Sequence, residues 1–168
     1  MRQEQVSAVM NDPLAQELLG SAIPARMAYN GTDGYPRAIP VGFFWKDGRI
    51  VMCTASNAYK VKALAANPKV ALTIDTDTQP YRAPAARGTA DVEIVDGVPP
   101  EYLDASRKSL NDEQQFRAFE AAVRSLYKQM AHISIAPEWA KVLDFETRLP
   151  SAVEELANPD DSAGGWMR

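Results

Sequence analysis

Histidine and cysteine are almost absent from this chain of 168 residues, and their scarcity excludes several kinds of site. His132 and Cys53 are the single copies of each, and together they cannot form a metal-ligand cluster. A Ser-His-Asp triad would depend on His132, and no Gly-x-Ser-x-Gly turn accompanies it. A lone cysteine cannot form an internal disulfide, which is typical of a reducing compartment. We therefore expect no metal, a structural His132 and an apolar, packed Cys53.

Long apolar runs and glycine-rich phosphate loops are also missing. No stretch approaches the roughly 20 apolar residues that span a bilayer, and no apolar run follows Arg2 as it would in a secretory signal. We expect a cytoplasmic protein with no membrane partner. Without a Gly-x-Gly-x-x-Gly sequence or a Gly-rich lysine loop, dinucleotide and nucleoside triphosphate folds find no support. The net charge of −4 disfavours nucleic acid as a partner.

The overall composition is that of an ordinary globular protein. Apolar residues make up 46% of the chain and charged residues 24%. The length suits one domain with a substantial core. We predict a single domain over residues 1–157, with an N-terminal helix and a helical insertion near 99–130, followed by a flexible tail over 158–168.

Runs of β-branched and aromatic residues between Asn-Gly or Asp-Gly turns predict strands. The predicted strands cover residues 25–29, 36–46, 49–54, 70–74, 86–95, 132–135 and 142–145. The last two flank a turn at Pro137. Because most connections are tight turns, we expect a mainly β fold, an antiparallel barrel with peripheral helices.

Apolar residues three and four positions apart predict the helices. Asp12 and Pro13 mark the start of one helix that stops at Gly20, and a weaker helix precedes it. The other predicted helices cover residues 57–66 with Asn57 as cap, Pro99 to about Leu110, Asn111 or Asp112 to about Met130, and a helical turn at 151–156.

The segment 48–74 contains four cations and not one Asp or Glu. Cations in the first turn of a helix oppose its dipole at a cost of roughly 0.3–1 kcal/mol. The same place offers free backbone amides beside the polar side chains of Thr54, Ser56 and Asn57. Each charge-assisted hydrogen bond to an anion could return roughly 1.5–3 kcal/mol, which outweighs that cost. The pattern is that of a phosphate cradle.

A plainer alternative is a solvated helix face whose lysines keep the protein soluble, and the segment by itself does not choose between the two. Lys60 and Lys62 are two positions apart and point to different sides of a helix. At most one of them faces a ligand squarely, and we predict that it is Lys60.

The strand before this segment contains Pro40, which lacks an amide hydrogen and therefore belongs on an edge or at a break in the ladder. Backbone groups freed at such a break could bind the polar edge of a planar ring, while Ile39 and Val41 cover its face. The structural alternative is an edge strand that the proline protects from aggregation.

In combination these segments resemble the family of pyridoxamine 5'-phosphate oxidase-like split-barrel proteins, which bind FMN or the deazaflavin F-420. The resemblance covers about 70 residues within 25–95, in the family's order. It is carried by the strand before Asp33-Gly34, Pro36 to Trp45, Met52-Cys53-Thr54, Tyr59 to Leu64, Asn67 to Leu72, and Arg87 to Ala90.

The resemblance implies a split β-barrel, a homodimer and cofactor sites between the two subunits. It places the strand 37–41 along the ring and the turn 54–60 on the phosphate, with Lys60 as the most dependable contact. It also lets residues near Tyr81 reach a site that the partner chain completes. The implied cofactor-binding residues are Arg37, Ile39, Pro40, Val41, Thr54, Ala55, Ser56, Asn57, Tyr59, Lys60, Tyr81 and Arg82.

The chain departs from the oxidase proper at three places. Tyr59 stands where the oxidase usually has an arginine, and Pro40-Val41-Gly42 replaces its apolar pair and lysine. The Trp- and Arg-rich signature near the oxidase C-terminus is missing as well. A substrate other than pyridoxamine phosphate is therefore expected.

Two functions of different classes fit these residues. The first is an oxidoreductase in which FMN, slightly preferred, or F-420 transfers hydride to or from a small organic substrate. The second is a non-catalytic carrier that stores the flavin or accommodates haem. The sequence assigns no catalytic side chain and leaves both functions open.

Overall fold

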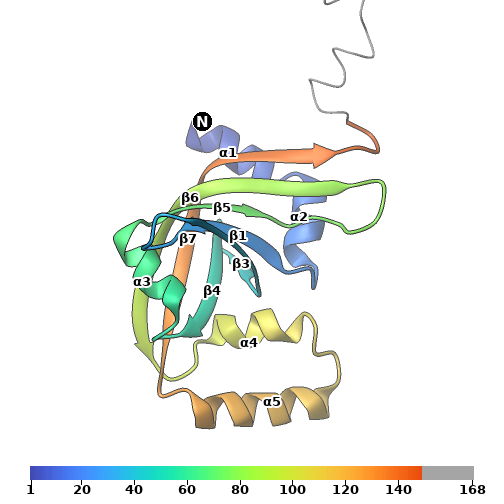
Figure 1. Ribbon diagram of the computed structural model, residues 1–168. Coiled ribbons are helices and arrows are strands. Elements are labelled where there is room, and N and C mark those ends of the chain that lie inside the picture. Colours follow the sequence, from blue (N-terminus) through green and yellow to red (C-terminus); the bar gives the residue numbers. More distant parts are fainter. Residues whose placement is uncertain (149–168) are drawn as a thin grey trace, which may run out of the picture.

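The computed structural model describes residues 1–148 as a strongly curved antiparallel sheet with helices on its outside (Figure 1). The helices are α1 (Gln3–Met10), α2 (Pro13–Gly20), α3 (Tyr59–Ala66), α4 (Pro100–Arg107) and α5 (Glu113–Leu126). The strands are β1 (Ala25–Asn30), β2 (Pro36–Val41), β3 (Phe44–Lys46), β4 (Arg49–Ala55), β5 (Lys69–Thr73), β6 (Arg82–Asp96) and β7 (Gln129–Asp144). The predicted antiparallel split barrel with peripheral helices is confirmed.

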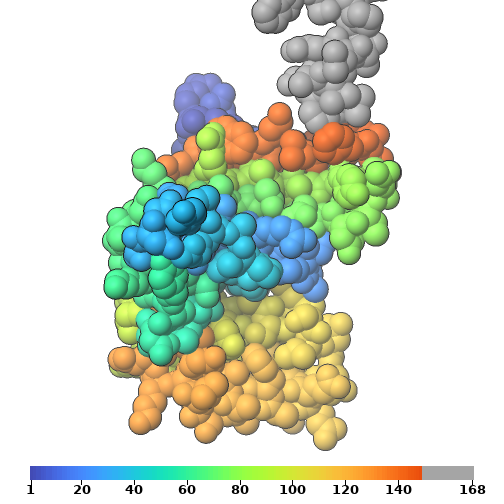
Figure 2. All heavy atoms as spheres, viewed as in Figure 1, coloured from blue at the N-terminus to red at the C-terminus, as the bar shows by residue number. Residues whose placement is uncertain are grey.

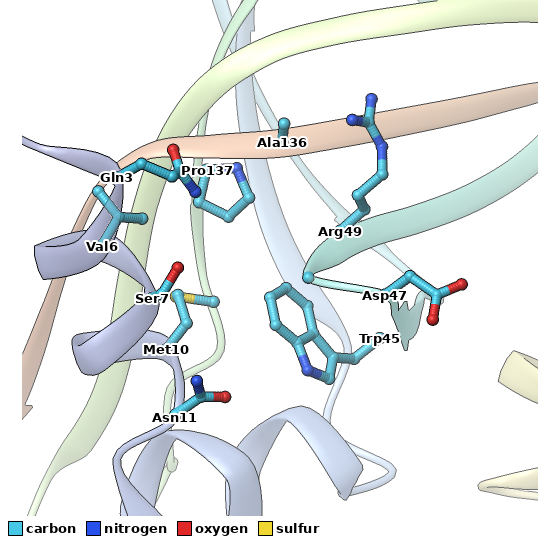
Figure 3. A pocket seen from close by; sticks show the side chains of 11 residues that line it. Gln3, Val6, Ser7, Met10, Asn11, Trp45, Asp47, Arg49, Ala136 and Pro137 are labelled. Atoms are coloured by element: carbon cyan, nitrogen blue, oxygen red, sulfur yellow. The ribbon is translucent and has the colours of Figure 1, made fainter.

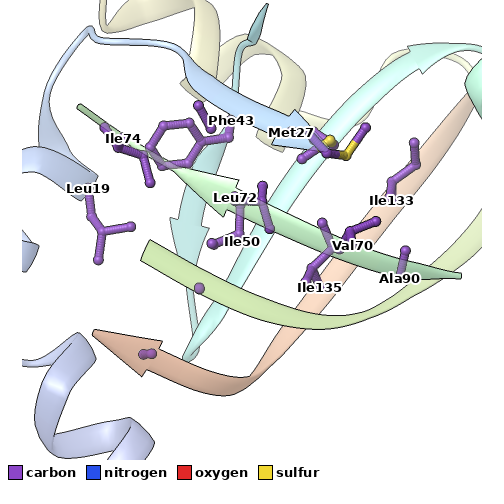
Figure 4. Packing of buried hydrophobic residues seen from close by; sticks show 14 of the residues in the cluster. Leu19, Met27, Phe43, Ile50, Val70, Leu72, Ile74, Ala90, Ile133 and Ile135 are labelled. Atoms are coloured by element: carbon purple, nitrogen blue, oxygen red, sulfur yellow. The ribbon is translucent and has the colours of Figure 1, made fainter. Parts of the chain in front are cut away.

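The strands lie in the order β2-β1-β5-β6-β7-β4-β3, so β2 and β3 are the two edges of the sheet. The inner face encloses the main core, where alternate residues of every strand meet (Figure 4). Its fully buried members include Met27, Ile50, Leu72, Ile133 and Ile135. Burying one such side chain stabilises the fold by about 1.5–3 kcal/mol.

Two strand predictions were wrong in their boundaries. The run 36–46 is two strands, because Gly42 and Phe43 form a corner at which the chain leaves β1 and turns to pair with β4. Phe43 is 2% exposed and anchors this corner in the core. The turn predicted at Pro137 is instead the middle of the continuous strand β7, opposite Gly88, where Glu138 is an extra residue of β7 and the register shifts. A proline is tolerated there because the bulge already interrupts the ladder.

Helices α2 and α5 begin at the predicted capping residues Asp12 and Asp112, whereas α3 does not begin at its predicted cap. Asp12 accepts a hydrogen bond from the amide of Leu14 at 2.9 Å and caps α2 as predicted, and α1 precedes it. Asn57 does not cap α3. The amide of Ala58 donates to the carbonyl of Ala55, which makes Ser56 and Asn57 the centre of a turn and delays the helix to Tyr59.

Helices α4 and α5 form a hairpin over a smaller core of their own, beside the barrel (Figure 2). This core contains Val98, Leu103, Phe116, Val123 and Met130. α5 ends at Leu126, so Met130 belongs to β7 rather than to the predicted helix.

Lys108, just after α4, ties the hairpin to the barrel. Its ammonium donates to the carbonyl of Leu19 at 2.7 Å and lies 4.0 Å from the ring centre of Phe43. Burial lowers the pKa of Lys108 to about 8. One side chain therefore links the hairpin to the end of α2 and to the β2–β3 corner.

Within residues 1–148, no helix is long and apolar enough to cross a bilayer. The helical turn predicted at 151–156 and the tail predicted at 158–168 lie outside the described residues.

The β6–β7 bulge provides a test of the fold. A Cβ at Gly88 would overlap the backbone carbonyl of Ala136, whereas Gly20 has open space around it. We expect Gly88→Ala to lower the free energy of unfolding by at least about 2 kcal/mol, while Gly20→Ala changes it little or raises it. Urea unfolding of both variants measures the difference, and equal stabilities would contradict the bulge.

Candidate functional site

The barrel is open along one seam, where β4 has only one strand partner for part of its length. β3 pairs with residues 49–51 of β4, while residues 52–55 pair only with β7 on the other side. Opposite this free edge lies the outer edge of β2, with Pro40 in the position expected for an edge strand. A hollow of about 210 Å³ occupies the seam, lined by Pro40, Val41, Gly42, Met52, Cys53, Thr54, Lys60 and Ile133.

Lys60 contributes the positive charge of this hollow. Its ammonium donates to the hydroxyl of Thr54 at 3.2 Å, and no acidic residue lines the space around it. Burial lowers the pKa of Lys60, because the charged form loses part of its hydration there. Lys62, two residues further along α3, is exposed. The structure therefore separates the two lysines as predicted.

The start of α3 adds backbone donors next to Lys60. Ala58 is the N-cap and makes no capping hydrogen bond through its side chain. The first amides of a helix have no partner inside the helix, and here the turn at Ser56 and Asn57 leads the chain directly into them. Amides, a hydroxyl and an ammonium are the donor set that a phosphate requires.

The residues predicted to bind the phosphate, 54–57, line two different hollows on opposite sides of this turn. Thr54 faces the seam hollow, whereas Ala55, Ser56 and Asn57 line a broader depression of about 750 Å³ at the foot of α5, together with Asp96, Leu126, Tyr127, Lys128 and Gln129. Adjacent strand residues point to opposite faces, which explains the division at Thr54 and Ala55. The structure thus brings Thr54 and Lys60 together, with Ser56 and Asn57 on the far side.

Arg37 and Tyr59 meet at the β1–β2 turn, beside the hollow rather than in it. The hydroxyl of Tyr59 lies 2.7 Å from the hydroxyl of Thr32 and accepts the Thr32 amide at 3.0 Å. The hydrogen bond to Thr32 is the main reason why the pKa of Tyr59 is lowered. Arg37 lies over the Tyr59 ring at 5.0 Å and pairs with Asp33 at 2.8 Å. This contact fixes the β1–β2 turn against α3. Arg37 stays paired with the carboxylate of Asp33.

The remaining ring residues and the distal pair have different surroundings. Ile39 and Val41 are half-buried and pack against the main core, and Val41 also lines the hollow. Tyr81 and Arg82 lie at the β5–β6 turn, away from α3 (Figure 1). Arg82 pairs with Asp144 at the end of β7, whereas Thr54 pairs with Ala131 near its start. Within one chain the structure does not bring Tyr81 and Arg82 to the cradle.

Cys53 and His132 behave as structural residues. Burial raises the pKa of the Cys53 thiol to about 12, which keeps it protonated and unreactive at neutral pH. His132 faces Glu101 at 4.0 Å, and Glu101 also binds Lys46 at 2.9 Å. Residues 1–148 contain no group of three His, Cys, Asp or Glu side chains that could hold a metal ion.

Another hollow, of about 310 Å³, lies between α1 and the β3–β4 turn (Figure 3). Trp45 and Met10 line it together with the polar side chains of Ser7, Asn11 and Arg49. None of the residues predicted to hold the cofactor is among its lining residues. The cradle prediction therefore belongs to the seam.

Sequence reasoning missed four residues of the seam hollow: Gly42, Met52, Cys53 and Ile133. Each belongs to a strand or corner that local pattern identifies, but the seam arises only when β2 and β4 face each other. The one local signal was Pro40, which marks the free edge.

Comparison with known proteins identifies the family and the fold of the chain. The family model described as pyridoxamine 5'-phosphate oxidase matches residues 12–130. No curated protein matches the sequence. Among solved structures, the conserved hypothetical protein Rv2991 from Mycobacterium tuberculosis is similar with a TM-score of 0.62 at 18% identity, covering 82% of this chain and 87% of that one.

Two further solved structures share the fold. One is an F-420 reductase, with a TM-score of 0.54 at 20% identity over 75% of this chain and 94% of that one. The other is HutZ, a haem storage protein from Vibrio cholerae, with a TM-score of 0.56 at 14% identity over 79% and 93%. On the family match and the split barrel with its seam hollow, the chain belongs to the pyridoxamine 5'-phosphate oxidase family.

Proposed function

We propose that the chain binds a phosphate-bearing flavin or deazaflavin, FMN or F-420, in the seam hollow and acts as an oxidoreductase on a small organic substrate. The observation that carries this proposal is Lys60. Its ammonium is half-buried beside Thr54, next to the uncapped start of α3, in a hollow without an acidic residue. A buried cation without a carboxylate is costly until an anion binds.

The chain's own residues fit the phosphate end of such a cofactor. Lys60 and Thr54 would hold the phosphate, and the free edges at Pro40 and Met52 would meet the polar rim of the ring. The bound cofactor would supply hydride transfer, while the protein supplies position, charge and a partly dry surrounding. No acid–base pair lines the hollow, which agrees with chemistry carried by the cofactor.

Family membership supports this proposal, and so does the likeness in fold to an F-420 reductase. A non-catalytic carrier is the alternative, since one neighbour in fold is a haem storage protein. His132, the one histidine of the chain, is not among the residues that line the hollow, which favours a flavin over haem.

The visible spectrum of the purified protein tests the function. We expect an absorbance band of a flavin or deazaflavin that bleaches when a reductant is added and returns when a suitable small acceptor follows. The rate of return, with free cofactor as control, measures catalysis. If no acceptor reoxidises the bound cofactor faster than the free cofactor, the protein is a carrier and not an oxidoreductase. A haem absorbance band would contradict the proposal of a flavin.

Two lysines on the same helix give a matched test of the cradle. Lys60→Ala should weaken FMN binding by about 10- to 100-fold, because it removes a charge-assisted hydrogen bond from a half-buried site. Lys62→Ala should change it less than about twofold, since exposed charges contribute little. Fluorescence titration of both variants measures the ratio. Equal affinities would count against the seam as the phosphate site.

We also propose a homodimer in which Tyr81 and Arg82 of one chain complete the cofactor site of the other. Both lie on the surface at the end of the sheet opposite α3, where a second chain can reach them. Pairing two chains about a twofold axis would create two identical sites.

Mixing two inactive variants tests this arrangement. Lys60→Ala and Arg82→Ala should each lose cofactor binding, but a mixed dimer would contain one site with neither change. We expect an unfolded and refolded equimolar mixture to recover about a quarter of the native cofactor, because half of the dimers are mixed and each holds one intact site. No recovery, or a monomer in sedimentation, would exclude the shared site.

A further inference from the structure

The turn between β5 and β6 ends beside a hollow that the cradle does not use. Its volume is about 320 Å³, within the range of small-molecule pockets. It is lined by Asp75, Thr76, Asp77, Tyr81, Arg82, Ala83, Leu143 and Phe145. Two aromatic rings stand at its rim, because Tyr81 is 49% exposed and Phe145 is 45% exposed. Half-exposed aromatic rings around a hollow are a common sign of a binding surface.

The backbone holds the two aromatic residues next to each other. The amide of Phe145 donates to the carbonyl of Tyr81 at 3.1 Å, which sets the two residues side by side. The amide of Arg82 donates to the hydroxyl of Thr76 at 3.0 Å, and the amide of Thr76 donates to the carbonyl of Arg82 at the same distance. The backbone that carries the two rings is therefore in place before a ligand arrives, which lowers the entropic cost of binding.

Two of the charged groups that line the hollow, Asp75 and Arg82, are paired within the chain, whereas Asp77 has no ion pair among the described residues. Asp75 binds Arg26 at 3.0 Å, and Arg82 pairs with Glu17 at 3.6 Å. Thr76 uses its polar groups on Arg82, as described. An incoming anion would have to displace Glu17 from Arg82 and would face the carboxylate of Asp77, whereas an uncharged ligand leaves the ion pairs intact. What the hollow offers is the apolar surface of Ala83, Leu143 and the two rings.

We propose that this hollow binds a small, planar, apolar molecule without negative charge between Tyr81 and Phe145. Flat rings stack on aromatic side chains, and negative charge would be excluded because a desolvated anion without a free cationic partner is costly. In the dimer proposed above, this end of the sheet approaches the partner's cofactor, so the molecule is the substrate. That last assignment rests on the proposed function, whereas binding itself does not.

Two naphthalenes that differ in charge test the proposal on the cofactor-free protein. We expect equilibrium dialysis to show that neutral 2-naphthamide binds at least about tenfold more tightly than the anion 2-naphthoate. Tyr81→Ala should weaken naphthamide binding by about three- to tenfold, the size of an aromatic stacking contribution. Tyr35→Ala, which removes a tyrosine that is 71% exposed on another turn, should leave it unchanged.

Phe145→Leu provides a second variant that keeps an apolar side chain and should also weaken naphthamide binding. Equal binding of the two naphthalenes, equal effects of Tyr81→Ala and Tyr35→Ala, or no binding of naphthamide would each overturn the proposal. Because these measurements need no cofactor, they stand apart from the proposed function. If naphthamide binds as expected while the protein takes up neither FMN nor F-420, only the proposed function fails.

Discussion

The incomplete pairing of β4 is the constraint on which the candidate site depends. β3 is only three residues long, so the second half of β4 has a strand on one side and an open edge on the other. A buried open edge would leave backbone donors and acceptors unsatisfied, which is costly. At the seam this edge meets β2, whose Pro40 cannot continue a ladder. The barrel stays split there, and the hollow exists because neither strand closes it.

The cations near the seam differ in whether a carboxylate neutralises them. Arg37 pairs with the carboxylate of Asp33 at the β1–β2 turn, so its charge is largely neutralised within the chain. Lys60 has no carboxylate partner within residues 1–148 and donates instead to the hydroxyl of Thr54. Tyr59 contributes to this difference, since its ring holds Arg37 at the turn and away from the hollow. The field at the cradle is thus set by one desolvated ammonium and the helix start.

Local sequence signals predicted most of the elements but not how they meet. Asp12 with Pro13 fixed the start of α2, and the Asp-Gly turns fixed the hairpins, because these motifs act over a few residues. The delayed start of α3 at Tyr59 and the continuation of β7 through Pro137 depend on partners, Ala55 and Gly88, that pattern alone does not pair. The different surroundings of Lys60 and Lys62 were predictable, since they follow from the geometry of a single helix. Gly42 and Ile133 were not, because they reach the hollow from distant parts of the chain.

The helical hairpin leaves and re-enters the sheet at a single point. Asp96 and Gln129 are cross-strand partners, their side chains are 2.9 Å apart, and the amide of Gly97 donates to the carbonyl of Lys128 at 2.7 Å. Residues 97–128 are therefore an insertion between the paired strands β6 and β7. The register of these two strands is already set where the insertion begins and ends. The insertion is in effect a replaceable module: a short turn could be grafted between Gly97 and Lys128, or a larger element inserted, while the alignment of β6 with β7 stays the same.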